Sequence, residues 1–277
     1  MISGFIRNSL KNSTFLIGCL IFFSVLFLAV FADIVAPYSF DEMEISNKLA
    51  QPDRNHIFGT DRYGRDVFSR VVHGSRIALK VGLIVVMIES LIGITLGLLA
   101  GYYGGIVNRI ILFITDFSWS MPPIILALAI ITMLGPSLNN VVISIAIVSW
   151  AQFTRIVRAK TQSLKNMPFV EAARAFGEND FNIIVIYILP NVLPSIIVIM
   201  TLALPSAILL TSSLGFLGLG AQPPLPDWGV ILSNGITLIR KAPWITIFPG
   251  LAIVYTVLGF NLIGEGLRDI IDPKLKV

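Results

Sequence analysis

Two carboxylates stand inside long apolar runs of this sequence, Glu89 and Asp116. A carboxylate in an apolar environment is costly unless it faces a cation, a polar partner or water. Each residue could therefore line a water-filled path, or it could pair with a cation such as Arg109 or with a neighbouring chain. Of these two interpretations, we favour the structural pairing for each carboxylate.

The other candidates for chemistry are His56, His73 and the single cysteine, Cys19. The two histidines lack the spacing of metal ligands, so we expect surface residues and no metal site. One cysteine excludes an intramolecular disulfide. The sequence also has no P-loop, no H-E-x-x-H and no G-x-S-x-G. We therefore predict neither ATP binding by a P-loop nor enzymatic catalysis, and no cofactor in this chain.

The amino-acid composition indicates whether these residues lie in a soluble or a membrane protein. Of the 277 residues, 55% are hydrophobic and 13% are charged, and the mean hydropathy is +0.85. Soluble domains average about 25% charged residues, so a soluble globular enzyme is excluded. The net charge of +4 comes from basic residues dispersed over several loops, which argues against nucleic-acid binding. We predict an all-α integral membrane protein.

A membrane helix needs about 20 mostly apolar residues. Six runs meet or approach this length, and Gly and Pro residues punctuate them as turns. We expect Met121-Pro122-Pro123 to break or kink the third run. The six predicted transmembrane helices fall within residues 12–32, 81–103, 110–134, 138–153, 191–212 and 243–264.

Loop charges predict the orientation of these spans. If the N-terminus is cytoplasmic, the basic residues of the short loops divide eleven to two in favour of the cytoplasmic side, as the positive-inside rule requires. The long segment 37–80 then lies outside. Its second half, from Gly64, has an amphipathic helical pattern, and we expect an elbow in the membrane interface that leads into the second span.

The loop after the fourth span has a distinctive pattern. Residues 166–176 predict a short helix with Glu171 exposed and the small Ala172 and Ala173 on its surface. Gly177 permits a sharp reversal. Small residues allow a partner to approach closely, so we interpret this helix as a docking device.

This loop resembles the EAA loop, E-A-A-x3-G-x9-I-x-L-P, of the permeases of ATP-binding cassette (ABC) importers. The matching positions are Glu171, Ala172, Ala173, Gly177, Leu189 and Pro190, whereas Tyr187 replaces the isoleucine. The resemblance implies that these residues couple the permease to its ATPase. It also places the loop in the cytoplasm.

Three further segments resemble the second permease of dipeptide, oligopeptide and nickel importers. They are Phe58–Arg70 (G-T-D-x-x-G-R-D-x-x-S-R), Leu214–Gly229 and Phe260–Asp269. The resemblance extends from about Ala36 to Lys276. It implies a type I importer fold with a transmembrane core at 76–266. Residues 1–75 would hold an N-tail, the extra first span and the extracytoplasmic segment, and 267–277 a cytoplasmic C-tail.

The same resemblance implies a bacterial inner-membrane complex with N- and C-termini in the cytoplasm. Its partners would be a homologous second permease, two cytoplasmic ATPases that bind ATP and magnesium, and an extracytoplasmic binding protein. Small peptides are the expected cargo, and nickel or a metal chelate is the alternative. A stand-alone secondary transporter is a distant alternative, because we see no convincing inverted repeat with two interrupted helices.

Overall fold

The computed structural model describes residues 9–271. All regular elements in that range are helices, and a single isolated bridge joins Thr60 and Asp66. The expected tails at 1–8 and 272–277 lie outside this range. The elements are α2 (Ser13–Val30), α3 (Ala32–Val35), the 3-10 turn η1 (Ile45–Asn47), α4 (Val67–Tyr103), α5 (Gly105–Trp119), α6 (Pro123–Leu134), α7 (Leu138–Leu164), α8 (Pro168–Ala175), α9 (Asp180–Asn182), the π-helical η2 (Ile183–Ile188), α10 (Leu189–Phe216), α11 (Trp228–Ile236) and α12 (Trp244–Ile271).

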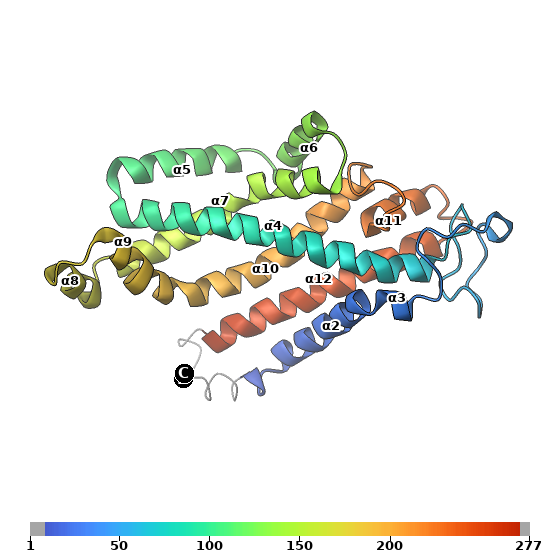
Figure 1. Ribbon diagram of the computed structural model, residues 1–277, viewed down its shortest axis with the longest axis horizontal. Coiled ribbons are helices and arrows are strands. Elements are labelled where there is room, and N and C mark those ends of the chain that lie inside the picture. Colours follow the sequence, from blue (N-terminus) through green and yellow to red (C-terminus); the bar gives the residue numbers. More distant parts are fainter. Residues whose placement is uncertain (1–8, 272–277) are drawn as a thin grey trace.

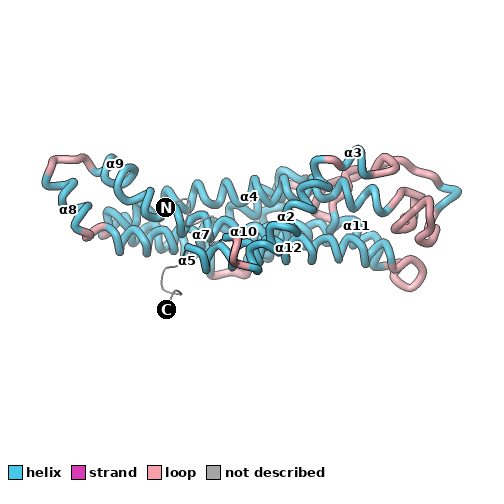
Figure 2. The backbone as a smooth tube through the Cα atoms, turned by 90° about the horizontal axis from the view of Figure 1, so that it is seen from below, coloured by secondary structure: helices cyan, strands magenta, loops and turns pink. Residues whose placement is uncertain are grey.

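The long helices lie side by side in an elongated bundle with two distinct ends (Figures 1 and 2). At one end, α8 and α9 project beyond the bundle; we call this the α8 end. At the other end, the loops of residues 36–66 gather near α3 and α11; we call this the loop end. Helix α4 packs mainly on α7, and α12 packs on α2, α10 and α11.

Five helices are long and apolar enough to cross a membrane. The pair α5 and α6 adds a sixth span if it is taken as one, although the two helices are bent by 88°. The break falls at Ser120–Pro122, where the proline lacks an amide hydrogen for the helical ladder. The predicted six spans, with an interruption in the third, are therefore confirmed.

Helix α4 differs from the prediction of an interfacial elbow. It runs without interruption over 37 residues, a length of about 55 Å at 1.5 Å per residue, whereas the hydrocarbon core measures about 30 Å. The amphipathic segment is thus a straight extension of the second span toward the loop end. Two of its polar side chains, Arg70 and His73, are buried, and both contact Phe40 of the preceding loop.

The close crossing of α4 and α7 depends on three glycines spaced one turn apart, Gly93, Gly97 and Gly101. A Cβ added to any of them would lie less than 3.0 Å from a side-chain atom of α7. The α7 residues at these points are Phe153, Val157 and Thr161. Glycines spaced in this way let two membrane helices approach closely, so α4 and α7 form the tightly packed centre of the bundle.

At the loop end, residues 36–66 fold over the start of α4. Asp66 caps this helix, because one of its oxygens accepts a 2.7 Å hydrogen bond from the Ser69 amide, and the other lies 3.0 Å from His56 Nδ1. His56 and His73 are 6% and 8% exposed, so the expectation of surface histidines was wrong. The expectation failed because it treated 37–66 as an open loop.

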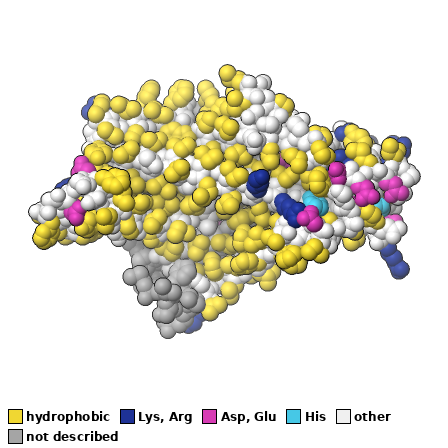
Figure 3. All heavy atoms as spheres, viewed as in Figure 1, with side chains coloured by type: hydrophobic (Ala, Val, Ile, Leu, Met, Phe, Trp, Pro, Cys, Tyr) yellow, Lys and Arg dark blue, Asp and Glu magenta, His cyan; other side chains and the backbone are white. Residues whose placement is uncertain are grey.

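The surface of the bundle matches a membrane environment. In Figure 3, hydrophobic side chains cover most of the middle of the visible face, while acidic groups gather toward the two ends. Large apolar residues such as Leu20, Leu91, Phe113 and Val254 are at least 60% exposed. Lipid is the solvent that accepts such a surface without cost.

Candidate functional site

The predicted docking helix exists as α8, eight residues that begin at Pro168. Proline suits this first position because its missing amide hydrogen is not needed there. Glu171 and Ala172 are exposed, as expected. Ala173 is only 4% exposed, however, and packs with Val170 into the cluster beneath the helix. Its predicted surface position was therefore wrong: the small side chain allows α8 to approach its own bundle.

The reversal predicted at Gly177 is also present. Gly177 has φ +84°, a conformation that glycine adopts without a steric cost. Its amide donates to the Arg174 carbonyl, and the Glu178 amide donates to the Ala173 carbonyl. These two bonds form a Schellman motif, which satisfies the last carbonyls of α8. The loop geometry is therefore fixed by the backbone.

Tyr102, near the end of α4, connects α8 to the bundle. Its hydroxyl donates a 2.6 Å hydrogen bond to Asp180, which begins α9 just after the reversal. The guanidinium of Arg174 lies over the Tyr102 ring at 5.4 Å from the centroid. Lys165, before α8, donates a 2.9 Å bond to the Tyr102 carbonyl. One residue of α4 thus contacts the segments on both sides of α8.

Leu189 and Pro190, the last two motif positions, lie inside a longer helical segment than predicted. Helical structure is continuous from Asp180 to Phe216, whereas the sequence suggested that the span begins after Pro190. The six residues before Leu189 form a π-helix, a common local adjustment of helical hydrogen bonding at functional sites. Pro190, which cannot donate to the helical ladder, follows directly.

Two exposed aromatic side chains flank the reversal and were not predicted as part of the site. Phe176 is 89% exposed and Phe181 is 71% exposed. The available signal was the presence of two phenylalanines in an otherwise polar loop. Together with Glu171 and Ala172 they form what we call the α8 knob, a small surface with one carboxylate and two apolar rings. Exposed aromatic residues of this kind are typical of protein interfaces.

The structure separates the two intramembrane carboxylates. Asp116 on α5 forms a 2.5 Å ion pair with Arg155 on α7, and the Arg155 guanidinium also lies 4.3 Å from the centroid of the Trp119 ring. The favoured structural pairing of Asp116 thus has a concrete partner in Arg155, and not in the suggested Arg109. Glu89, in contrast, lines a pocket of about 230 Å³ and is 3% exposed.

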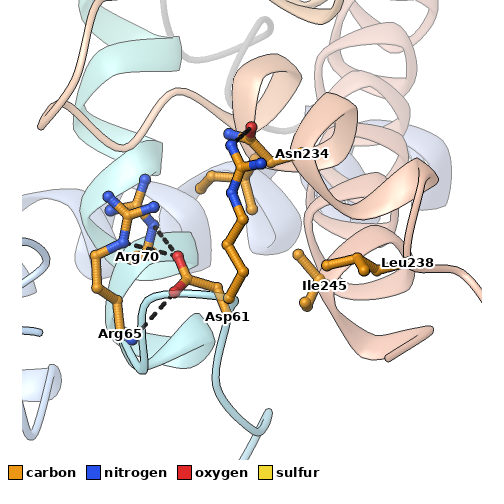
Figure 4. Close-up of a pocket in the computed structure, with 8 residues that line it drawn as sticks. Asp61, Arg65, Arg70, Asn234, Leu238 and Ile245 are labelled. Carbon is orange, nitrogen blue, oxygen red and sulfur yellow. Dashed lines mark hydrogen bonds and ion pairs between the residues drawn. The ribbon is translucent and has the colours of Figure 1, made fainter. Parts of the chain in front are cut away.

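At the loop end, charged residues connect the loops to α11. Asp61 accepts a 2.7 Å bond from Arg65, and Arg70 lies 4.0 Å from the same oxygen. Arg62 donates a 2.6 Å bond to Asn234 of α11. Figure 4 shows Asp61, Arg65, Arg70 and Asn234 around a small pocket, whose volume is about 10 Å³. The cluster connects the start of α4 and the preceding loop to α11, and its pocket is too small for a peptide.

Asp227 caps α11 and lies against the glycine-rich segment that precedes it. One of its oxygens accepts bonds from the amides of Gly229 and Val230, at 2.7 and 3.2 Å. A Cβ at Gly215 or Gly220 would lie 2.7 or 3.2 Å from the carboxylate, so these glycines provide the space it occupies. Burial raises the pKa of the Asp227 carboxyl above its ordinary value, although the amide bonds partly oppose this shift. Helix α11 begins at Trp228, directly after this cap.

Within residues 9–271, no group of three or more His, Cys, Asp and Glu side chains could hold a metal ion. The described residues thus form a bundle of apolar helices with a projecting knob at one end and, among its helices, a pocket lined by Glu89. Such an arrangement suits movement of a solute driven by a partner protein.

Comparisons with known proteins agree with this description. A family described as binding-protein-dependent transport system inner membrane component matches residues 93–277. The dipeptide transport system permease protein DppC of Alkalihalophilus pseudofirmus is 47% identical over 96% of this chain and 88% of its own length. The glutathione transport system permease protein GsiD of Pectobacterium atrosepticum is 42% identical over 98% of this chain and 91% of its own.

The fold has a counterpart among solved structures. A chain from the inward-facing MetNI methionine ABC transporter superposes with a TM-score of 0.59. The alignment covers 73% of this chain and 97% of that one, at 20% identity. At this identity the likeness concerns the fold alone.

This chain belongs to the family of binding-protein-dependent transport system inner membrane components. It is a multi-pass inner-membrane permease of an ABC importer and is not itself a catalyst, because ATP is bound by partner ATPase subunits. Membership in this family also implies a substrate-binding protein as a partner. The predicted permease class and all-α importer fold are thereby confirmed.

Proposed function

We propose that this chain forms half of the translocation pathway for small peptides, in a complex with a homologous second permease, two ATPases and one binding protein. The relatives are named for dipeptide and for glutathione transport, and both cargoes are small peptides. The shared chemistry of these cargoes is a short peptide backbone with charged ends.

The α8 knob is the feature that supports our proposal that ATP hydrolysis in the partner subunits drives the movement of this chain. An exposed helix on a flexible tether would transmit little force. Here α8 buries Val170 and Ala173 against the bundle, and its flanking segments contact Tyr102. A partner that pushes on Glu171, Ala172, Phe176 and Phe181 would therefore move α4 and α10 together.

The mechanism would be alternating access. The ATPases close on ATP and displace the knob, and the bundle changes between two arrangements that open to opposite sides. Because the Gly93–Gly101 stripe packs α4 tightly on α7, these two helices would move as one body. The break between α5 and α6 supplies the place where the third span can change its bend.

We place the α8 end and both termini in the cytoplasm and the loop end outside. Three spans separate residues 36–66 from α8, if α5 and α6 count as one, so the two must lie on opposite sides. We retain the division into residues 1–75, 76–266 and 267–277, with the middle part as the transmembrane core.

Transport by the reconstituted complex tests the cargo. Proteoliposomes holding all subunits are supplied with binding protein, ATP and one labelled solute: dialanine, trialanine, glutathione or nickel–histidine chelate. We expect ATP-dependent accumulation of one or more of the peptides. Accumulation of the nickel chelate alone would replace the peptide assignment, and no accumulation of any peptide would refute it.

A further inference from the structure

The pocket beside Glu89 lies where five helices meet. Its polar lining consists of Glu89 on α4, Ser149 and Gln152 on α7, and Ser206 on α10, while Trp119 and Pro123 close it from the two sides of the α5–α6 break. The cavity volume is about 230 Å³, somewhat below the range of about 300–1,000 Å³ typical of sites that enclose a whole drug-sized molecule. The pocket is therefore suited to one end of a small solute.

Glu89 is the one charged residue in this lining, and no cation is close to it. Glu89 is 3% exposed, and Ser149 lines the same pocket. Among the described residues, no Lys, Arg or His lies within 4.0 Å of its carboxylate. Asp116, on the neighbouring span, has Arg155 as a direct partner. The pocket thus holds a carboxylate that lacks its cation.

The neighbouring groups indicate which cation would suit it. A divalent metal ion takes six or more oxygen ligands and usually several carboxylates, and this lining supplies one carboxylate. An ammonium group needs one anion and a few neutral acceptors for its remaining hydrogens. The Ser149 and Ser206 hydroxyls and the Gln152 amide oxygen are such acceptors, and the hydroxyls and the Gln152 NH2 group can also donate to a peptide carbonyl.

We propose that the Glu89 pocket binds the protonated α-amino group of a peptide as it passes through the membrane. This inference rests on the proposed peptide cargo and extends it to one subsite. Glu89 would supply charge recognition within the pathway itself, separate from any recognition by the binding protein. The ion pair between Glu89 and the peptide ammonium would form only while cargo is present, so the site need not bind tightly.

Binding to the complete permease–ATPase complex in nanodiscs, without binding protein, tests this subsite. The probes are labelled dialanine and N-acetyl-dialanine, which differ only in the ammonium charge. We expect the wild-type complex to prefer dialanine by about tenfold or more, Glu89→Asp to keep part of this preference, and Glu89→Gln to lose it.

Two controls separate the possible outcomes. Yield and melting temperature of each variant complex show whether Glu89 serves assembly only, since a purely structural residue would change these and leave the preference for the free amine intact. That result, or a wild-type complex without preference for dialanine, overturns the inference. If the wild-type complex transports dialanine in the assay with binding protein, the proposed function stands even when this subsite fails.

Discussion

The hydroxyl of Tyr102 lies 2.6 Å from a carboxylate oxygen of Asp180, and this bond joins the end of α4 to the segment that follows the α8 knob. The two residues are 78 positions apart. Because α4 also packs along α7, a displacement of the knob can reach the centre of the bundle through this contact. The coupling pathway we propose therefore passes through Tyr102.

Tyr102→Phe removes this hydroxyl and keeps the ring beneath Arg174. A hydrogen bond to a charged group contributes about 1.5–3 kcal/mol, so the link between knob and bundle should weaken while the fold persists. We expect fewer dialanine molecules transported per ATP hydrolysed. Tyr103→Phe is the matched control, because its side chain is exposed. Equal stoichiometry in both variants would remove Tyr102 from the coupling pathway.

Gly177→Ala should disturb the knob without any steric clash. An added Cβ would meet nothing within 4 Å, so the cost comes from φ +84° alone, about 1–2 kcal/mol for a residue with a side chain. The Schellman turn should loosen and the affinity for the ATPase subunits should fall. Gly135→Ala is the control, since Gly135 has φ +88° and open space but lies between α6 and α7. A similar loss of ATPase binding in both variants would contradict a local role for Gly177.

The Asp116–Arg155 ion pair should stabilise the protein, so that removing one charge is more harmful than removing both. Asp116→Asn leaves the Arg155 guanidinium, on a membrane-spanning helix, without its anion, and an unpaired charge in such a segment is costly. We expect a lower melting temperature and lower yield of the complex. Adding Arg155→Gln should recover part of the loss, because removing both charges is usually better tolerated than removing one. Normal stability of Asp116→Asn combined with poor transport would place Asp116 on the pathway instead.

Asp227 should make stability depend on pH. Its folded pKa is raised by burial, so its contribution is fully present below the unfolded value of about 3.9 and is lost as pH rises through the folded pKa. Asp227→Asn keeps an acceptor for the α11 amides and does not ionise. The melting temperature of this variant relative to wild type should therefore increase between pH 4 and pH 8. A constant difference across this range would show that Asp227 does not titrate as described.

Local patterns predicted local structure well. The apolar runs predicted the spans, Pro122 and Pro123 predicted the broken third helix, and Gly177 predicted the reversal after α8. Each of these features depends on residues within a few positions of one another, so that hydropathy and backbone preference decide the outcome.

Burial by distant segments could not be predicted in the same way. His56 and Ala173 are buried by other segments of the chain. The residues next to them in the sequence do not reveal which segments these are. Arg155, the partner of Asp116, is 39 positions away. The pocket beside Glu89 requires five helices to meet, and helix packing, unlike helix formation, leaves no periodic signal in one segment.

Cross-linking of the α8 knob to an ATPase subunit tests the central claim most directly. In a Cys19→Ser background, Ala172→Cys and Ser46→Cys each place one exposed thiol at opposite ends of the bundle. The assembled complex in inverted membrane vesicles is treated with a cysteine-to-amine cross-linker. We predict a product containing this chain and the ATPase from Ala172→Cys, sensitive to ATP, and none from Ser46→Cys. An ATPase product from Ser46→Cys, or labelling of Ala172→Cys by an impermeant reagent outside intact cells, would contradict the account.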